Sequence, residues 1–398
     1  MLRHLLRLTW HRKSRHLMLS LEILLAFVIV FGIAACALRY LQLYRAPLGF
    51  DGRQTWSVSM QMADLPPEAI PPDTYDRFLR ALRELPEVRA AGFASAAPYT
   101  LSTWTGDFTS PQTGARVEAN RMDASDGAAE ALGIKLTAGR WFDASDDGQD
   151  VLPAVLDRRM ATALFPGRAA LGQRFASAER GDNRTYRVVG LVDTFRNKGP
   201  LMTPTNFVFT RFAPHASDAR VRVILVKVAP GTPRAFEAKL NARLRLVRND
   251  WSYQIAPLAA LRTSLLKEEL TPLVILAVIA AFMLAMVAFG LFGVLWQNTT
   301  RRIPEFGLRR AIGARAGDVY RQIVFEQLLL GSGAMAVGLL FLVQLPLTGA
   351  LGERLDWPVF AGAAALSMAV IYLLSFVCAL YPGWRASRLD PAAALHYE

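Results

Sequence analysis

Few side chains in this chain of 398 residues are spaced as a catalytic or metal site would require. Four of the five histidines lie close to the two ends of the chain: His4, His11, His16 and His396. His215 lies in the long middle segment beside Pro214, and its neighbourhood is typical of a surface loop. A zinc site or a Ser/His relay needs several such groups to converge. We therefore expect no catalytic residue and no metal site.

An acidic run offers a second possibility, with carboxylates at Asp143, Asp146, Asp147 and Asp150. Calcium takes oxygen ligands of this kind, but only where a folded loop makes them converge. A solvated turn is the favoured interpretation.

Nucleotide chemistry also lacks its usual signature. A phosphate-binding loop ends in Gly-Lys-Ser or Gly-Lys-Thr, and no Gly-Lys pair occurs in the sequence. The chain is expected to bind no cofactor and to hydrolyse no ATP by itself.

The most informative segment is a basic connector, residues 297–322, between apolar segments 273–296 and 323–345. Pro304 suits the first turn of a helix, and Gly313 suits a left-handed stop. Ala314 stands where a Ser or Thr cap would be expected, so Asp318 or Gly317 must serve as the cap of the next helix, which is expected to start near Asp318. The candidate contact residues of the connector are Ile303, Pro304, Phe306, Leu308, Arg309, Arg310, Ile312 and Gly313.

Four apolar segments are long enough to cross a bilayer, which takes roughly 20 residues. They span residues 17–38, 273–296, 323–345 and 358–381. Between them lie a large segment, 39–271, and a short loop, 346–357; segments 1–16 and 382–398 flank the set. Glu22 and Glu326, near the ends of their spans, are interpreted as anchoring or packing residues beside Arg15 and Arg321.

Charge predicts the orientation of these spans. Segments 1–16, 297–322 and 382–398 together hold thirteen basic and four acidic residues, a net +9 of the chain's +12. Basic flanks stay in the cytosol. Both termini and the connector are therefore expected there, and nucleic-acid binding is not needed to explain the charge.

The N-terminus imitates a secretory or lipoprotein signal, with Ala35-Cys36-Ala37 after an apolar run. That run is longer than the 7 to 15 residues typical of a signal core. We expect the first span to be retained, preceded by a short interfacial helix or a disordered basic start.

Segment 39–271 is expected to fold as an α+β domain of two lobes. Residues 55–60, 73–85 and 88–94 read as strand, helix and strand, and residues 221–228, 232–247 and 252–255 repeat that order. Between them, residues 99–126 are polar and turn-rich, and strands are expected at 151–156 and 186–192, which suggests a second lobe.

An amphipathic stalk is expected just before the second span. Leu258, Leu261, Leu265 and Leu266 recur at helical spacing, with charged residues between them. This stalk, near 258–271, would continue the span outward.

We call the expected 39–271 domain the outer domain. Three of its segments are similar to the periplasmic core domain of MacB-type permeases: LGIKLTAGRWF (132–142), VLDRRMATALFPGRAALGQRF (155–175) and YRVVGLVD (186–193). With the connector and the ending RASRLDPAAALHYE (385–398), the chain resembles the MacB/FtsX-like permeases of ABC transporters over nearly its whole length. MacB carries a fused ATPase domain, and this sequence shows none.

The resemblance implies a permease subunit of the bacterial inner membrane with both termini cytosolic. A separate cytosolic ATPase would hold ATP and Mg²⁺ and dock on the connector, driving efflux by moving the periplasmic domain. Expected partners are a second permease copy or a paralogue, membrane lipid, and a periplasmic adaptor with an outer-membrane channel. The alternatives are an FtsX-like regulator of a periplasmic enzyme and a lipoprotein-release-type extractor. A simple membrane-anchored sensor would leave the connector unexplained.

Overall fold

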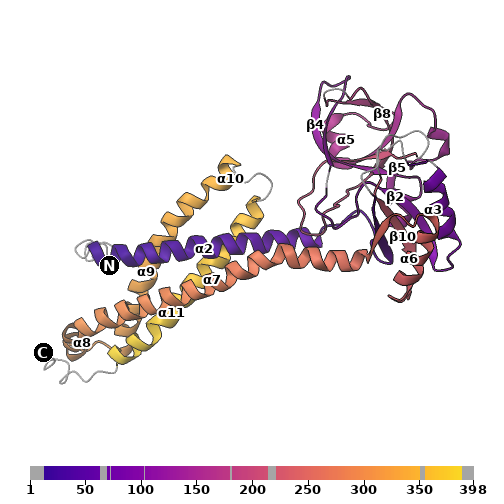
Figure 1. The fold of residues 1–398 in the computed structure, drawn as a ribbon. Helices are drawn as coiled ribbons and strands as arrows, with labels where there is room; N and C mark the ends of the chain where they lie inside the picture. Colours follow the sequence, from indigo (N-terminus) through magenta and orange to yellow (C-terminus); the bar gives the residue numbers. More distant parts are fainter. Residues whose placement is uncertain are drawn as a thin grey trace. The chain divides into compact units, whose positions relative to one another are not determined.

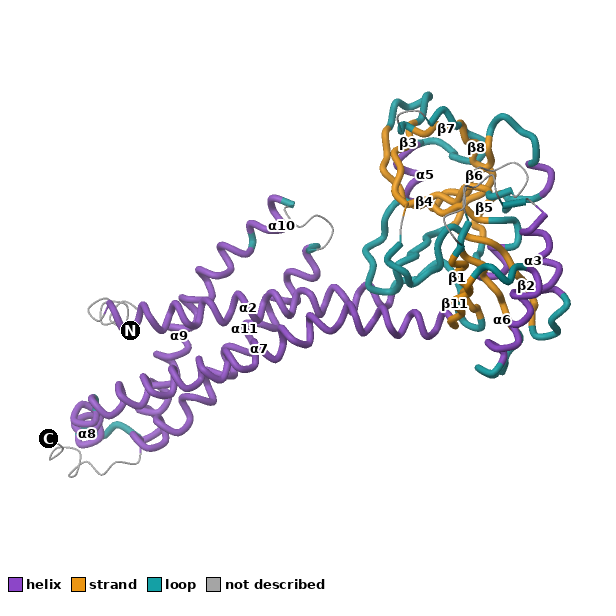
Figure 2. Tube along the Cα trace, in the orientation of Figure 1, coloured by secondary structure: helices purple, strands orange, loops and turns teal. Residues whose placement is uncertain are grey.

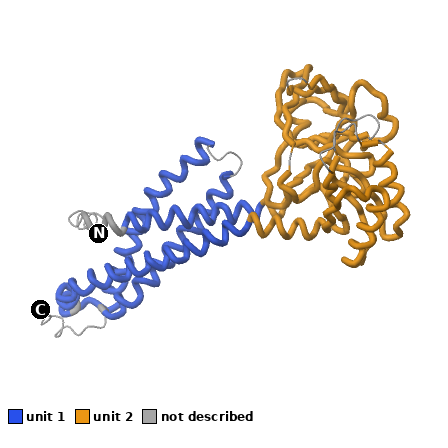
Figure 3. The backbone as a smooth tube through the Cα atoms, in the orientation of Figure 1, with its two compact units in different colours: residues 1–42, 270–398 blue, residues 43–269 orange. Residues whose placement is uncertain are grey.

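The computed structural model describes residues 13–62, 70–71, 73–102, 104–179, 182–213, 221–349 and 355–387, without the side chains of 13–19, 310 and 386–387. The interfacial segment, His215 and the end of the tail lie outside or largely outside these residues. Two compact units divide the chain (Figure 3): residues 1–42 with 270–398, and residues 43–269. Each is described by itself.

The first unit is helical. Its long helices are α2 (Lys13–Arg45), α7 (Leu258–Arg301), α9 (Ala316–Leu342) and α11 (Trp357–Ser387) (Figure 1). Residues 43–45 of α2 and 258–269 of α7 belong to the second unit. Two short helices join them, α8 (Ile303–Ala311) and α10 (Gln344–Thr348). Four of these helices are long and apolar enough to span a membrane. The expected set of four apolar helices is thus confirmed.

Small residues let these helices approach each other closely. A Cβ built on Gly338 of α9 would lie 2.8 Å from a ring carbon of Phe27, which is fully buried on α2. A Cβ on Gly290 of α7 would lie 2.9 Å from a carboxylate oxygen of Glu22. Because lipid tails are as apolar as the helices, close packing of this kind is a main source of helix association in a membrane.

Four strands of the second unit form a split βαβ arrangement. They are β1 (Thr55–Gln61), β2 (Val88–Ala94), β10 (Val223–Val228) and β11 (Ser252–Pro257), in the spatial order β11-β1-β10-β2 with antiparallel neighbours. Helices α3 (Asp73–Arg83) and α6 (Phe236–Val247) supply the crossovers and share a core with the sheet. The two expected strand–helix–strand units therefore interleave, as in ferredoxin-like folds.

The segment between β2 and β10 builds the second lobe. Its strands are β3 (Trp104–Thr109), β4 (Arg116–Ala124), β5 (Leu136–Gly139), β6 (Leu152–Asp157), β7 (Arg174–Ser177), β8 (Thr185–Val192) and β9 (Phe207–Arg211), coloured orange in Figure 2. Six of them pair in a closed ring, β4-β3-β7-β8-β6-β9 and back to β4. Closure removes the exposed strand edges that promote aggregation. The helices α4 (Ala128–Leu132) and α5 (Arg158–Leu164) and the 3₁₀ turn η2 (Ala144–Asp146) complete this lobe.

Two findings refine the expectations for this domain. Residues 99–126 hold two strands rather than mainly turns, and β4 is central because it pairs with β2, β3 and β9. One sheet runs through both lobes, joined at the pair Ala94 and Ala124. Ser125 strengthens that junction by accepting the Phe93 N–H at 2.8 Å.

Candidate coupling site

The connector folds into the short helix α8, and its end is fixed by backbone geometry. Pro304 occupies the second helical position, where its missing N–H costs no intrahelical bond. At the other end, Gly313 has a φ of +105°, and the Ala314 N–H bonds the Arg309 carbonyl at 3.0 Å. This bond across Gly313 is the Schellman closure of a helix C-terminus. The chain then turns directly into α9.

The start of α9 lies slightly earlier than expected, at Ala316. The Asp318 carboxylate accepts the backbone N–H of Arg315 at 3.1 Å. Asp318 thus supports the helix start from its first turn, although the helix does not begin there. The missing Ser or Thr at Ala314 is compensated in this way.

Helix α8 is held against α9 by an apolar cluster. Phe306 packs with Val319 and Ile323, and all three are buried. Ile303 is buried as well, at 7 % exposure. These inward residues fix the helix in place.

A charged network joins the same two helices. The guanidinium of Arg302 bonds the Glu326 carboxylate at 2.7 Å and the Glu305 carboxylate at 2.9 Å. Arg309 bonds Glu305 at 2.7 Å and also Gln322. Glu326 is therefore an anchor, as expected from its position, but the partner observed is Arg302 and not Arg321. Arg302, Glu305 and Gln322 were not singled out from the sequence.

Two apolar residues of the connector face outward. Leu308, on α8, is 53 % exposed, and Ile312, which directly follows the last residue of α8, is 78 % exposed. The Ile312 N–H bonds the Leu308 carbonyl at 3.1 Å, so the two residues lie one helical turn apart. Pro304 is exposed too, while the side chain of Arg310 is not among those described. A fixed helix end with two exposed aliphatic side chains is suited to contact a partner protein.

The expected stalk is not a free amphipathic helix, because most of its leucines pack into the core of the domain. Leu258 is fully buried and Leu265 nearly so, both in the core of the outer domain, and Leu261 packs against that core. Leu266 is only partly buried and is not part of this cluster. The first turns of α7 are therefore core elements of the domain.

The acidic run engages arginines. Asp146 bonds Arg140 at 2.6 and 2.7 Å, and Asp147 pairs with Arg211. These contacts explain why the pKa of Asp146 is lowered, chiefly by its bonds to Arg140. Among the described residues, no group of three or more His, Cys, Asp or Glu residues is arranged to share a metal ion.

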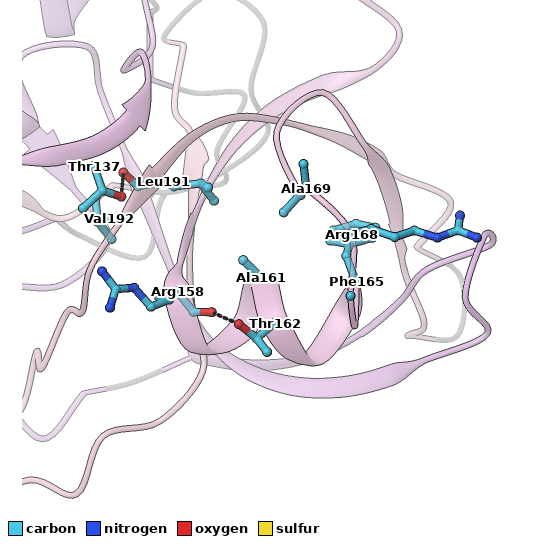
Figure 4. A pocket seen from close by; sticks show the side chains of 11 residues that line it. Thr137, Arg158, Ala161, Thr162, Phe165, Arg168, Ala169, Leu191 and Val192 are labelled. Atoms are coloured by element: carbon cyan, nitrogen blue, oxygen red, sulfur yellow. Dashed lines mark hydrogen bonds between the residues drawn. The ribbon is translucent and has the colours of Figure 1, made fainter.

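One cavity of about 460 Å³ lies in the second lobe beside α5 (Figure 4). Its two threonines donate to backbone carbonyls, Thr137 to Leu191 at 3.1 Å and Thr162 to Arg158 at 2.9 Å. The guanidinium of Arg158 pairs with Asp193 at 2.7 Å. The rest of the lining is mostly small or apolar, so this hollow does not present converging polar groups.

These features define a multi-pass membrane protein with an α+β domain between its first and second apolar helices. Residues 23–243 match the model of the MacB-like periplasmic core domain, and residues 277–391 match that of the FtsX-like permease C-terminal region. The chain belongs to this family of MacB-like, FtsX-like ABC transporter permeases.

Individual relatives agree with that assignment. The chain is 26 % identical over 274 residues to the "Macrolide export ATP-binding/permease protein MacB" of Bdellovibrio bacteriovorus, covering 65 % of this chain and 41 % of that protein. It is 26 % identical over 328 residues to the protein of the same name from Azoarcus sp., covering 80 % and 47 %. The chain thus spans less than half the length of these relatives.

A solved structure, the periplasmic region of MacB from Actinobacillus actinomycetemcomitans, is also similar. It is 15 % identical with a TM-score of 0.39, and the match covers 56 % of this chain and 97 % of that one.

Proposed function

We propose that this permease subunit docks through α8 on a separate cytosolic ABC ATPase and converts ATP-driven closure of that partner into motion of the 43–269 domain. ATP and Mg²⁺ are held by the ATPase. The chain sits in the bacterial inner membrane with both termini in the cytosol, in line with the net +9 charge on those segments. Export is the process, as the names of the relatives suggest.

The main support for this proposal is the way α8 packs on α9 while two aliphatic residues near its end stay exposed. Its inner side is fixed to α9 by Phe306 and by the Arg302–Glu326 bond, whereas Leu308 and Ile312 stay exposed. Exposed aliphatic residues on a rigid element are typical of a protein contact, since burying them on binding releases their hydration water. A helix that only tethered the chain to lipid headgroups would not need this fixed shape.

The proposed path of motion from the connector to the 43–269 domain follows one continuous helix. Helix α7 runs without interruption for 44 residues, from Leu258 to Arg301, with Pro272 inside it. Arg301 adjoins the connector, while Leu258 and Leu265 are buried in the outer domain. A displacement of α7 must therefore move the domain core that holds those leucines. The proposed assembly contains two permease copies or a paralogue pair, contacts membrane lipid, and delivers substrate to a periplasmic adaptor and outer-membrane channel.

Copurification tests the proposal. The tagged full chain is co-expressed with candidate ABC ATPase subunits of its own organism and isolated in mild detergent. We expect one ATPase to be recovered in equal amount, with ATP turnover that the permease alone lacks. Recovery of no ATPase under any condition would contradict the assignment, and recovery of an ATPase with a cell-wall hydrolase would favour the regulator instead.

A further inference from the structure

Arg196 occupies an unusual place in the outer domain, because its guanidinium is buried and surrounded by backbone carbonyls. The residue is 1 % exposed. One terminal nitrogen donates to the carbonyls of Leu43 at 2.9 Å and Ala46 at 3.1 Å. The other donates to Pro200 and to Met202 at 2.7 Å, and Nε donates to Met202 at 3.0 Å. All five N–H groups of the fork find an acceptor.

Leu43 lies in the last turn of α2, which finishes at Arg45, and Ala46 directly follows the helix. The Leu43 carbonyl also accepts the Ala46 N–H at 3.1 Å. Carbonyls in the last turn of a helix have no partner within the helix, and the helix dipole places partial negative charge there. A guanidinium satisfies both conditions with fixed, planar geometry, which an ammonium cannot reproduce. Arg196 therefore acts as a C-terminal cap supplied from 150 residues away in the sequence.

The backbone around Arg196 contacts the chain segment that follows α2. The Arg196 N–H donates to the Leu48 carbonyl at 2.9 Å. Gly49, at a φ of +86°, lies so close to Thr194 that a Cβ there would be 1.7 Å from its carbonyl oxygen. The loop of residues 194–202 and the end of α2 are thus joined by both side-chain and backbone contacts.

The same loop touches the beginning of α7. A Cβ on Gly199 would lie 3.1 Å from Leu265 of α7. In addition, Arg262 of α7 donates to the Tyr44 hydroxyl at 3.3 Å, and its guanidinium lies 5.7 Å from the centre of that ring. Tyr99, buried between Gly199 and Phe50, has a φ of +66°, a rare backbone state for a residue with a side chain. This strained backbone conformation at Tyr99 persists because the surrounding contacts stabilise it.

We propose that Arg196 is the positioning residue that locks the outer ends of α2 and α7 and the 194–202 loop into one joint, through which helix motion reaches the domain. The inference rests on the proposed function. Without the guanidinium, the last turn of α2 loses its cap and moves separately from the domain. The partner ATPase would then still hydrolyse ATP, but the resulting motion of the helices would not be transmitted to the domain.

The first test needs no ATPase. Amide hydrogen exchange is measured on the full chain in detergent for wild type, Arg196→Met, Arg196→Lys and Arg211→Met. Arg211→Met is the matched control, because Arg211 is also an arginine with an almost buried side chain, at 7 % exposure, but pairs with Asp126 and Asp147. We expect amides of residues 43–49 to exchange about tenfold faster or more in Arg196→Met, since several charge-assisted bonds are lost. Arg196→Lys should give a smaller increase, and Arg211→Met none at these residues. Wild-type protection at 43–49 in both Arg196 variants would overturn the inference.

The second test measures coupling. A cysteine at Leu246, which is 77 % exposed, carries an environment-sensitive dye in the full complex with its ATPase, in a background without Cys36 and Cys378. ATP should change the fluorescence in wild type and in Arg211→Met. In Arg196→Met we expect ATP turnover within about twofold of wild type and a fluorescence change reduced several-fold. An undiminished change would refute the role of Arg196. Absence of ATPase binding in wild type would instead refute the proposed function and leave the exchange result to decide on the joint.

Discussion

Arg302 and Glu326 are 24 residues apart in the sequence, and their side chains bond at 2.7 Å. Glu326 lies on α9, and Arg302 immediately precedes α8, so this bond ties the connector to an apolar helix. The guanidinium also lies 5.1 Å from the centre of the Phe306 ring. Both charged side chains are less than one third exposed, at 22 % and 32 %. An ion pair that is partly shielded from water is worth more than a surface pair.

Removing one partner of this bond should loosen α8. We expect Arg302→Met to destabilise the packing of α8 on α9 by roughly 1–3 kcal/mol, because hydrogen bonds to charged groups are worth about that much. Glu305 would keep its bond to Arg309, and Glu326 would keep its bond to Gln322 at 2.8 Å. Glu326→Gln keeps an acceptor and should cost less. Hydrogen exchange of the amides of residues 303–311 measures the effect, and Arg301→Met, at an exposed neighbouring arginine, is the control. Equal exchange in all variants would contradict the tether.

The exposed pair Leu308 and Ile312, at the C-terminal end of α8, should determine binding of the ATPase. Leu308→Asp and Ile312→Asp are expected to weaken that affinity by about tenfold or more, as loss of a central apolar contact does. Arg309→Gln with Arg310→Gln tests the alternative that the connector only tethers the chain to anionic lipid. Affinity is measured by titrating ATPase onto the chain in nanodiscs. If the charge variants abolish binding and the Asp variants do not, docking through the apolar pair is wrong.

Gly313 should tolerate no side chain without a cost. Its φ of +105° disfavours any residue with a Cβ, by roughly 1–2 kcal/mol. Apart from Gly313 and its two chain neighbours, no described heavy atom lies within 4 Å of a Cβ built there, so the cost is one of backbone strain and not of a clash. Gly313→Val should therefore displace the helix end and weaken ATPase coupling while the four apolar helices still insert. Gly317→Ala is the matched control, because Gly317 also has open space but lies inside α9, where alanine is favourable. Equal coupling in both variants would show that the left-handed stop is unimportant.

Topology can be tested with single cysteines at exposed positions. In a background without Cys36 and Cys378, a cysteine at Leu246 should react with a membrane-impermeant maleimide added to spheroplasts. A cysteine at Ile312, which is 78 % exposed, should react only after the membrane is opened. This follows from the basic residues flanking the connector. Labelling of position 312 from outside would reverse the orientation proposed for the chain.

Asp157 should make the second lobe less stable as pH rises from about 4 to about 6. Burial raises the pKa of this carboxyl to about 6, while it accepts the N–H groups of Met160 and Phe207. The unfolded chain releases its proton near pKa 3.8, before the folded protein does, so folding stability falls through this window and is constant above it. The loss is on the order of 3 kcal/mol, at about 1.4 kcal/mol per pKa unit.

The variant Asp157→Asn isolates this effect, because asparagine accepts the same bonds and does not titrate. Exchange protection of residues 158–164, corrected for the intrinsic pH dependence of exchange, should lose its decline between pH 4 and pH 6 in the variant. Asp182, whose pKa is lowered to about 2 chiefly by its bond to Arg184, titrates below this window. An identical decline in variant and wild type would assign it to another group.

Some features of this chain are encoded locally and were readable without a structure. The apolar segments are detected because a membrane span depends on the length and composition of one stretch. The strands β1, β2, β10 and β11 are detected because alternating or continuous apolar residues predict strands. Gly313 and Pro304 act through their own backbone geometry. The quoted segments of the outer domain were enough to indicate the family.

Strands β3 and β4 were missed because their apolar content is too low to stand out. In β4, the buried positions include Asn120, whose amide is satisfied by Thr205 at 2.7 Å. A polar residue at a buried strand position favours the prediction of a turn, because its hydrogen-bond partner is distant in the sequence. The closed ring of strands could not be predicted either, because the pairing of β4 with β9 joins residues far apart in the chain.

The sequence alone determined the four apolar segments, the charge bias from which their orientation is predicted and the position of the connector, because each depends on neighbouring residues. Only the tertiary structure decided which residues act together. It placed Leu258 and Leu265 in the domain core, gave Glu326 its partner in Arg302 and brought Arg196 to the end of α2. Contacts of this kind depend on where distant segments meet, and a buried charge is stable only where such a meeting supplies enough acceptors.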